Sequence, residues 1–269
     1  GEMRGNLIVQ GFPLARSDIL GPAAKLLEGS ASGVARIGGK LSSFDITADI
    51  NVTPVRIMGA PFGGSDLHVQ MTQKPPAEKP IGKTPCGAPI AAKFDKEAYL
   101  KDTSPQGEYR VSGALFGNQI RLQDFVVTRQ KAPVVTGKVT LDRFDLGPIG
   151  KIITVGDDPA AETPSMPLGG EISGEVVLER IATNDLAHAK ATFAPKSLVL
   201  HRGGQRIELH ETGSVFTLQD DTLTIPRITF DLSAPNGFKG AVSVDGTVKK
   251  VTRGAELGLE AELSPIDLG

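Results

Sequence analysis

The sequence predicts a mainly β chain built from two tandem copies of one unit. Two observations carry this prediction. Apolar residues alternate with polar ones along most of the chain, which is the period of a half-buried strand. Blocks of glycine and apolar residues also recur in the same order in the two halves of the 269 residues. Such recurrence gives the organisation of the chain as well as its fold class.

The alternation is clearest in residues 46–52, 67–71 and 228–232, where every second residue is apolar. Runs of this kind are about six to ten residues long and are separated by turns that contain Gly, Asn, Asp or Pro. We therefore expect a succession of antiparallel strands that fills most of the chain.

The repeat is carried first by residues 5–14 and 137–146, which both read Gly-x-apolar-x-apolar-x-x-Phe-x-Leu. Residues 21–27 and 147–153 then share the pattern Gly-Pro-x-x-Lys-apolar-apolar. Three weaker matches follow in the same order: 32–34 with 173–175, 63–69 with 203–209, and 119–125 with 222–228. Five matches in one order predict a true duplication.

The matches divide the chain into residues 1–136, residues 137–258, and the start of a third copy at 259–269. The first copy carries a Pro- and Lys-rich excursion at 74–106, and the second carries a linker at 156–168. Because the chain ends at the point of the repeat where it begins, we expect it to be part of a longer protein. The excursion should leave the strand succession, since proline cannot donate to a central ladder.

One short helix is expected in each copy, at residues 22–28 and 148–155. Proline is favoured in the first turn of a helix, and the apolar residues that follow have helical spacing. Each unit is thus predicted to be a strand, a short helix and a run of antiparallel strands.

Composition weighs against several classes of partner. Aromatic residues make up 5% of the chain and Trp is absent, whereas binders of sugars and single-stranded nucleic acids commonly stack rings. The formal net charge is −2 and the basic residues are scattered, so no phosphate-binding patch stands out. We expect no nucleic-acid partner. The sequence also holds no apolar run of the roughly 18 residues that a spanning helix needs.

The sequence contains no motif that is typical of catalysis or metal binding. The four histidines lack zinc-site spacing, and the nearest nucleophile elbow, residues 29–33, has Ala31 at its centre. Nucleotide-binding glycine motifs are absent from the sequence. We therefore expect a protein that is not an enzyme and that has no cofactor, no metal site and no catalytic residue.

Three polar features of the sequence are better explained by structure than by chemistry. His68 and His210 occupy polar positions of alternating strands, so both should point to solvent. Asp220 and Asp221 form a tight turn between two strands rather than an acid–base pair. Cys86, the one cysteine, lies in the Pro-rich excursion and is expected to be incidental.

The apolar faces of the strands are the best candidate for a functional surface. With so few helices, the sheet must either close on itself as a packed core or leave an apolar trough; the sequence leaves both open. The candidate lining residues alternate with polar neighbours in both copies. They are Leu7, Val9, Ile50, Val52, Leu67, Val69, Ile120, Leu122, Val139, Leu141, Val176, Leu178, Ile207, Leu209, Leu223, Ile225, Phe230, Val242 and Val244.

The block at residues 5–14, the Gly-Pro segment after it and the strand that begins at Ser32 resemble the repeat of the TamB and AsmA-like family. So do the strand pairs in residues 119–127 and 222–232. The resemblance implies an elongated, curled antiparallel sheet with a β-groove. It also implies a periplasmic protein anchored in the inner membrane of a Gram-negative bacterium, with the anchor outside this chain.

The function implied by this resemblance is carriage of phospholipid, by its acyl chains, between the inner and outer membranes. Support of outer-membrane protein assembly with a barrel of the TamA or BamA type is implied as well. The alternative from another class is a purely structural β-sandwich or solenoid spacer, or a module that binds unfolded outer-membrane strands by edge pairing.

Overall fold

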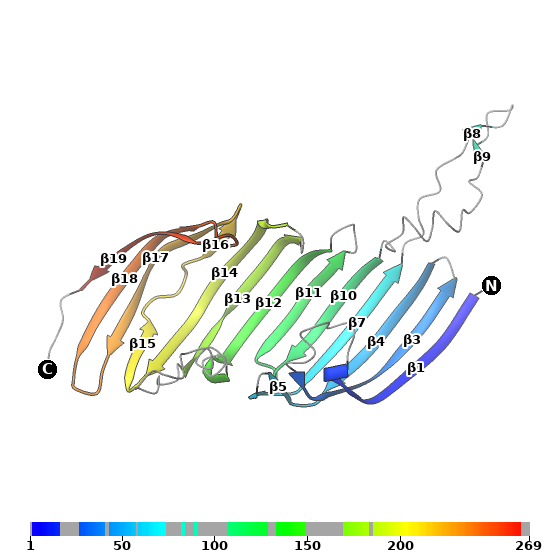
Figure 1. Cartoon of the computed structure of the whole chain (residues 1–269), viewed down its shortest axis with the longest axis horizontal. Helices are drawn as coiled ribbons and strands as arrows, with labels where there is room; N and C mark the ends of the chain where they lie inside the picture. Colours follow the sequence, from blue (N-terminus) through cyan, green and yellow to red (C-terminus); the bar gives the residue numbers. More distant parts are fainter. Residues whose placement is uncertain are drawn as a thin grey trace.

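The computed structural model describes residues 2–16, 27–40, 43–57, 59–73, 82–83, 89–90, 107–128, 133–148, 169–182 and 185–264. One antiparallel sheet of 14 strands dominates them (Figure 1). Its strands are β1 (Glu2–Pro13), β3 (Ser30–Lys40), β4 (Ser43–Val52), β7 (Ser65–Gln73), β10 (Gly107–Leu115), β11 (Ile120–Thr128), β12 (Val134–Asp145), β13 (Gly169–Ala182), β14 (Asp185–Arg202), β15 (Gln205–Leu209), β16 (Phe216–Gln219), β17 (Thr222–Ser233), β18 (Lys239–Lys249) and β19 (Glu256–Leu263).

The strands of this sheet follow one another in space in the order of the sequence. β15 and β16 share one position, because both lie between β14 and β17. β7 pairs directly with β10, so the excursion at residues 74–106 is not inserted between these two neighbouring strands. Within that excursion, β8 (Gly82–Lys83) and β9 (Pro89–Ile90) form a separate pair.

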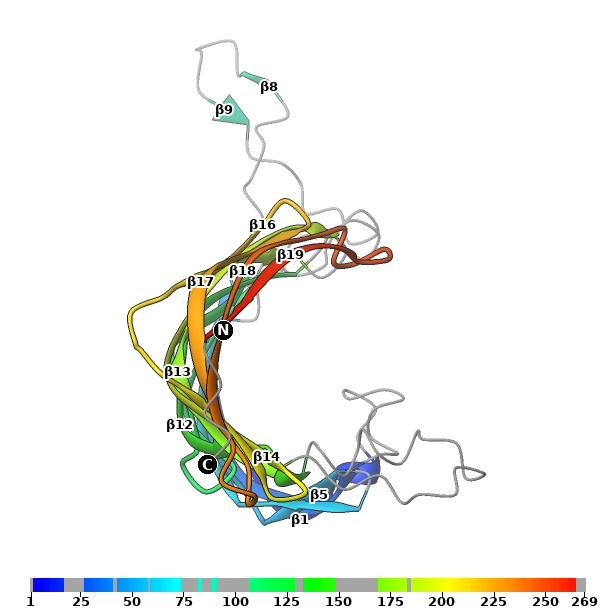
Figure 2. The ribbon, with the colours of Figure 1, turned by 90° about the vertical axis from the view of Figure 1, so that its left-hand side faces the viewer.

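The sheet is a single layer that bends into a C-shaped cross-section (Figure 2). This confirms the predicted mainly β fold with a curled, elongated antiparallel sheet. Buried apolar residues are few in the described part of the chain, and no large side chain there is fully buried. The buried ones are Val55, Ala60, Phe144, Ala182, Ala189 and Ile228. A closed sandwich of this size would bury many more.

Local irregularities of the backbone accompany the curvature. β1 has a bulge between Val9 and Phe12, and β12 has one between Leu141 and Phe144. An extra residue on one strand bends that strand and increases its twist. Gly11 (φ 59°) and Arg143 (φ 44°) occupy the left-handed region in these two bulges.

β1 and β12 are matched in detail. Both are 12 residues long, and their bounds coincide when residues 5–14 are aligned with 137–146. At the end of each strand a leucine amide donates to a glycine carbonyl: Leu14 to Gly29 at 3.0 Å, and Leu146 to Gly170 at 2.8 Å. Both glycines have φ of 144°. The bounds of the two predicted repeats remain a prediction.

The prediction of a helix at residues 22–28 is wrong for its last two residues, which form strand β2 (Leu27–Glu28). These two residues pair with β5 (Val55–Ile57), which in turn pairs with β6 (Ala60–Phe62). By pairing with β5, the backbone groups of Leu27 and Glu28 gain hydrogen-bond partners. The carbonyl groups in the last turn of a helix have no such partners within the helix. A 3₁₀ turn, η1 (Leu14–Arg16), follows β1 instead. Residues 22–26 and 149–155 lie outside the described residues.

The small sheet β2–β5–β6 meets the main sheet at one rim. Phe62 of β6 packs on Phe116 in the β10–β11 turn, with ring centroids 4.8 Å apart, and Phe116 lies 6.4 Å from Phe144 of β12. Tilted rings at such separations are favourable. This aromatic cluster and the buried Val55 and Ala60 form a local core that closes the rim.

Candidate functional site

An unbroken row of apolar residues and glycines crosses the main sheet from β1 to β16. Residues directly opposite in an antiparallel ladder project to the same side of the sheet. The register therefore places these residues on one face, in the order Val9, Gly33, Ile50, Leu67, Gly113, Leu122, Val139, Val176, Phe193 and Phe216.

The row continues to the other edge of the sheet. β16 and β17 pair through Thr217 and Thr224, which brings Phe216 next to Ile225. Ile225 is followed by Gly246 in β18 and Leu259 in β19. We call this whole set, from Val9 to Leu259, the apolar row. It crosses all 13 strand positions, or about 58 Å at ~4.8 Å per strand.

Neighbouring rows on the same side are apolar as well. One runs through Leu7, Ala35, Ala48, Val69, Val111 and Phe125, and another through Leu178, Ala191, Leu218, Leu223, Val248 and Leu257. The same register puts all 19 predicted lining residues on this side, which we call the apolar face.

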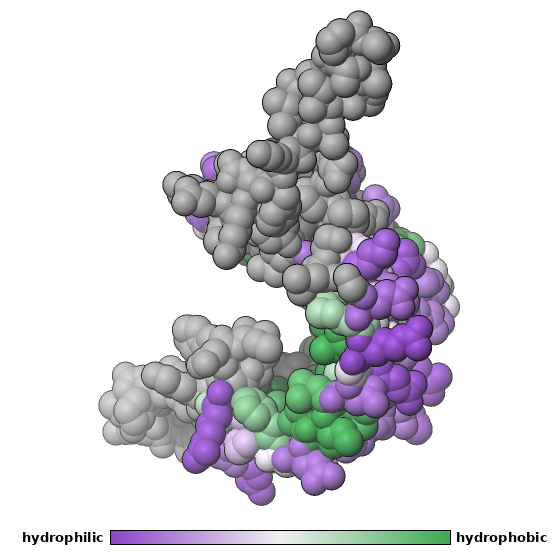
Figure 3. Space-filling view, turned by 90° about the vertical axis from the view of Figure 1, so that its right-hand side faces the viewer, coloured by the Kyte–Doolittle hydropathy of each residue, from purple (hydrophilic) through white to green (hydrophobic). Residues whose placement is uncertain are grey.

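The apolar face is the inner side of the curl. Seen from the β1 end, hydrophobic residues gather on the inside of the curve and hydrophilic residues cover the outside (Figure 3). The exposed fractions are large at the two ends of the face, with 56% for Leu7, 70% for Leu257 and 65% for Leu263. The described residues place no second sheet opposite this face.

Several members of the apolar face were missing from the sequence prediction. They are Val111, Phe193, Phe216, Leu218, Val248 and Leu257. The sequence did contain a signal for several of them, because apolar residues also occupy every second position in residues 216–219 and 257–260. Phe193 and Phe216 pack with ring centroids 5.9 Å apart, and they make this part of the row the bulkiest.

The outer face carries cross-strand polar pairs. His68 Nδ1 lies 2.7 Å from Asp49 Oδ1, and His210 Nδ1 lies 2.8 Å from Asp231 Oδ2. Both imidazoles are half exposed, as predicted for these two histidines. The hydrogen bond to Asp231 raises the pKa of His210 above its ordinary value. Exposed ion pairs of this kind contribute little to stability.

An open hollow of about 590 Å³ lies over β1, β3, β4, β7 and β10. Nine of its 14 lining residues project to the outer face by the alternation of the strands. They include Asp49 and His68, with Ser112 opposite His68 in the ladder. These are the residue types of a hydrolase triad. Asp49 is two-thirds exposed and His68 is half exposed, so water competes for the hydrogen bonds of both side chains. We therefore assign these three residues no catalytic role.

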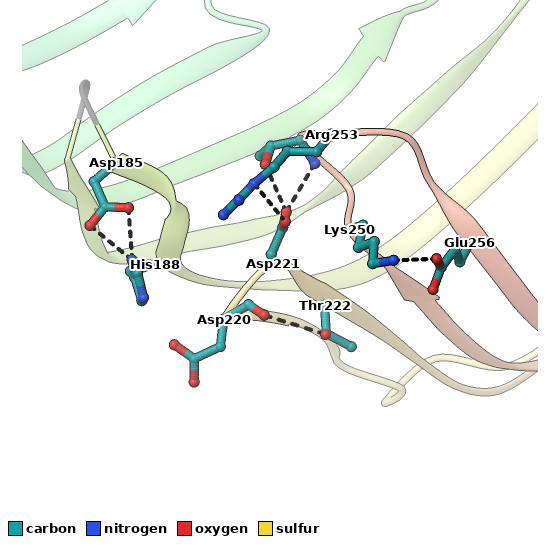
Figure 4. A network of polar contacts seen from close by, with 9 residues as sticks. Asp185, His188, Asp220, Asp221, Thr222, Lys250, Arg253 and Glu256 are labelled. Atoms are coloured by element: carbon teal, nitrogen blue, oxygen red, sulfur yellow. Dashed lines mark hydrogen bonds and ion pairs between the residues drawn. The ribbon is translucent and has the colours of Figure 1, made fainter.

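Asp220 and Asp221 form the turn between β16 and β17, as the sequence predicts. Their φ angles of 50° and 60° are those of the tight turn typical of hairpins. Asp221 Oδ1 accepts hydrogen bonds from the Thr252 amide and hydroxyl, both at 2.9 Å, which ties this turn to the β18–β19 turn (Figure 4). Close by, a hydrogen bond with His188 lowers the pKa of Asp185.

The described residues contain no cluster of three or more His, Cys, Asp or Glu side chains that could hold a metal ion. Among the same residues, no helix is long and apolar enough to cross a membrane.

No protein-family model, curated protein or solved structure matches this chain.

Proposed function

We propose that the apolar face holds the acyl chains of phospholipids and lets them pass along the curled sheet between two membranes. The observation that carries this proposal is the apolar row, which crosses every strand position without a polar side chain. Each methylene transferred from water to such a surface gains about 0.8 kcal/mol. The headgroup can stay in water at the open side of the C.

Movement along the face needs sites of similar depth. Most members of the apolar row are aliphatic, so an acyl chain that moves along the row exchanges one set of contacts for a similar set. Gly33 and Gly113 have no side chain, so the layer of side chains on the apolar face is thinner at β3 and β10. The rings of Phe193 and Phe216 project further from the sheet at β14 and β16. Passage is therefore expected to be slowest over the Phe193–Phe216 pair.

The setting we propose is the periplasm of a Gram-negative bacterium, between an inner-membrane anchor and an outer-membrane barrel of the TamA or BamA type. This part of the proposal rests on the resemblance to the TamB and AsmA-like repeat. Transfer of lipid along such a face needs no bond to be made or broken, so the proposed activity is not enzymatic.

The test is a paired measurement of bound lipid and thermal stability on the purified chain. Leu122→Asp and Ile225→Asp place a charge in the apolar row, at half-buried positions of β11 and β17. A charge costs much to desolvate, so acyl chains should avoid it. Gln123→Asp is the matched control, because Gln123 neighbours Leu122 and projects to the outer face.

We expect the wild type and Gln123→Asp to retain phospholipid in native mass spectrometry, and the two row variants to lose it while they stay folded. If the row variants unfold, the face is a packed core and not a lipid path. If they stay folded and keep their lipid, these residues do not line the path.

A further inference from the structure

A short hairpin leaves the main sheet between two strands that are neighbours in it. β5 and β6 pair with each other and lie between β4 and β7 in the sequence, yet β4 pairs directly with β7. β5 lies at the lower end of the C-shaped cross-section (Figure 2). We call this hairpin, residues 55–57 and 59–62, the flap.

One side of the flap is apolar. Val55 lies opposite Phe62 in the hairpin and Ile57 lies opposite Ala60, so these four side chains project to one side. Arg56 projects to the other side and is exposed. Val55 and Ala60 are buried, which shows that the apolar side is packed against the rim of the main sheet.

The rim at the flap is the most densely packed part of an otherwise open sheet. Of the eight buried residues in the described part of the chain, four gather here, namely Val55, Ala60, Ser65 and Phe144. Ser65 and Phe144 project to the same side as the apolar face. Val9, on that side but away from the flap, is 37% exposed. The flap therefore adds a second layer to the apolar face at this rim.

The chain is anchored directly before and after the flap. The Thr53 amide donates to a carbonyl of β3 at 3.0 Å, and the Gly64 carbonyl accepts from an amide of the β10–β11 turn at 2.7 Å. Pro54 and Gly63 are left between these anchors and the flap. Proline has no amide that could tie it to a neighbour, and glycine adopts a wide range of backbone angles. Residues of this kind at the ends of an element commonly serve as hinges.

Phe116 in the β10–β11 turn holds the flap and is under backbone strain. Its ring packs on Phe62 with centroids 4.8 Å apart, and its amide donates to Oγ of Ser65 at 3.2 Å. Its φ is 55°, in the left-handed region that bulky residues rarely adopt. Such strain persists only while the surroundings hold the residue, and it is typical of switch regions. When Phe62 moves away, the turn is free to relax, so strain at Phe116 favours the open flap.

We propose that the flap opens about Pro54 and Gly63, that Phe116 is its latch, and that it controls the access of acyl chains to the apolar face at this rim. Opening breaks the two residue pairs between β2 and β5. It also uncovers the rings of Phe116 and Phe144, so an acyl chain can take the place of Phe62. The role in access rests on the proposed function, whereas the motion itself does not.

The first test is hydrogen exchange of the purified chain, measured by mass spectrometry on peptides from the flap and from β12 and β13. Flap amides should exchange faster than those of β12 and β13 and depend little on urea, because a local opening exposes little surface. Phe62→Ala should speed exchange in the flap about tenfold and leave β12 and β13 unchanged. Phe216→Ala is the control, since it removes a ring from the pair on β14 and β16 and should not affect the flap.

Two outcomes of this test overturn the proposal. Flap amides of the wild type that exchange as slowly as those of β12 and β13 would show that the hairpin opens only when the whole sheet unfolds. A Phe62→Ala variant in which all strands exchange faster alike would show that the hairpin belongs to one cooperative unit with the sheet.

The second test measures the release of a phosphatidylcholine with a fluorescent acyl chain from the purified chain to unlabelled phosphatidylcholine vesicles. Phe62→Ala should release it several-fold faster than the wild type, and Gln123→Asp, on the outer face, should match the wild type. Equal rates in the wild type and Phe62→Ala would overturn the role in access. If no form of the chain takes up the lipid, the proposed function fails, and hydrogen exchange still decides whether the flap moves.

Discussion

The backbone N–H of Arg143 donates a hydrogen bond to Oγ of Ser173, with 2.9 Å between the two atoms. Gly11 and Ser32 form the same bond at 3.0 Å. In each case a residue with positive φ sits in a bulge of one strand, and a serine on the following strand satisfies its amide. The bulge and its serine therefore act together, and they occur at corresponding places of the two matched blocks.

Ser173→Ala should lower the free energy of unfolding by about 0.5–1.5 kcal/mol, which is the usual net contribution of one hydrogen bond. The bulge of β12 loses the acceptor for its unpaired amide, and water at this exposed site replaces it only in part. Urea unfolding measures the change. Ser197→Ala is the control, because Ser197 lies opposite Ser173 on β14. An equal loss in both variants would show that the bond to Arg143 contributes nothing specific.

Gly113→Ala should destabilise the sheet by roughly 2–4 kcal/mol. Gly113 has φ of 139°, and an added Cβ would lie 2.1 Å from the backbone oxygen of Asp66 on β7. The two strands would have to separate in the middle of the main sheet. Gly38→Ala on β3 is the control, since no atom lies within 4 Å of its added Cβ. Thermal unfolding of both variants decides the matter: similar midpoints would contradict the argument.

Alternation and recurrence predicted much of this fold. Residues 5–14 and 137–146 read alike, and they form strands of equal length with equivalent bulges. The alternation also predicted residues that the register places on one side of the sheet, because side chains in a strand have a period of two whatever lies above them. For the same reason it could not tell an open trough from a packed core. Among the described residues, the curl and the scarcity of buried side chains favour an open trough.

Two features were beyond the sequence for different reasons. The apolar spacing of Leu26 and Leu27 fits a helix, but over seven residues it does not exclude a short strand, and β5 offered Leu27 and Glu28 a partner. The bulge at Arg143 gave no signal of its own, since arginine rarely adopts positive φ. Only the glycine at the matching position, Gly11, hinted at it.

Asp221→Ala should lower the free energy of unfolding by roughly 1–3 kcal/mol. The side chain of Asp221 is 14% exposed and accepts two hydrogen bonds from Thr252, and its backbone has φ of 60°. Alanine loses both bonds and tolerates this φ less well. Asp221→Asn keeps an acceptor and suits the turn, so it should lose less. Urea titrations of the two variants provide the test, and an equal loss would assign the effect to charge alone.

His210→Gln should make the stability of the chain less dependent on pH. The hydrogen bond to Asp231 raises the pKa of His210 in the folded state above its ordinary value of about 6.5. A raised folded-state pKa means that the folded chain holds the proton more tightly than the unfolded chain does. The resulting stabilisation is complete below the ordinary pKa and disappears as the pH rises through the raised value.

The difference in unfolding free energy between wild type and His210→Gln should therefore be largest near pH 5 and shrink towards pH 8, the range of about 5 to 8 in which histidine titrates. It should be small throughout, since the pair is half exposed and screened by water. In the control Asp231→Asn, the NMR titration of the His210 ring should return to the ordinary pKa because the charged acceptor is gone. A difference that grows with pH, or a ring pKa that ignores Asp231→Asn, would show that this pair does not set the pH response.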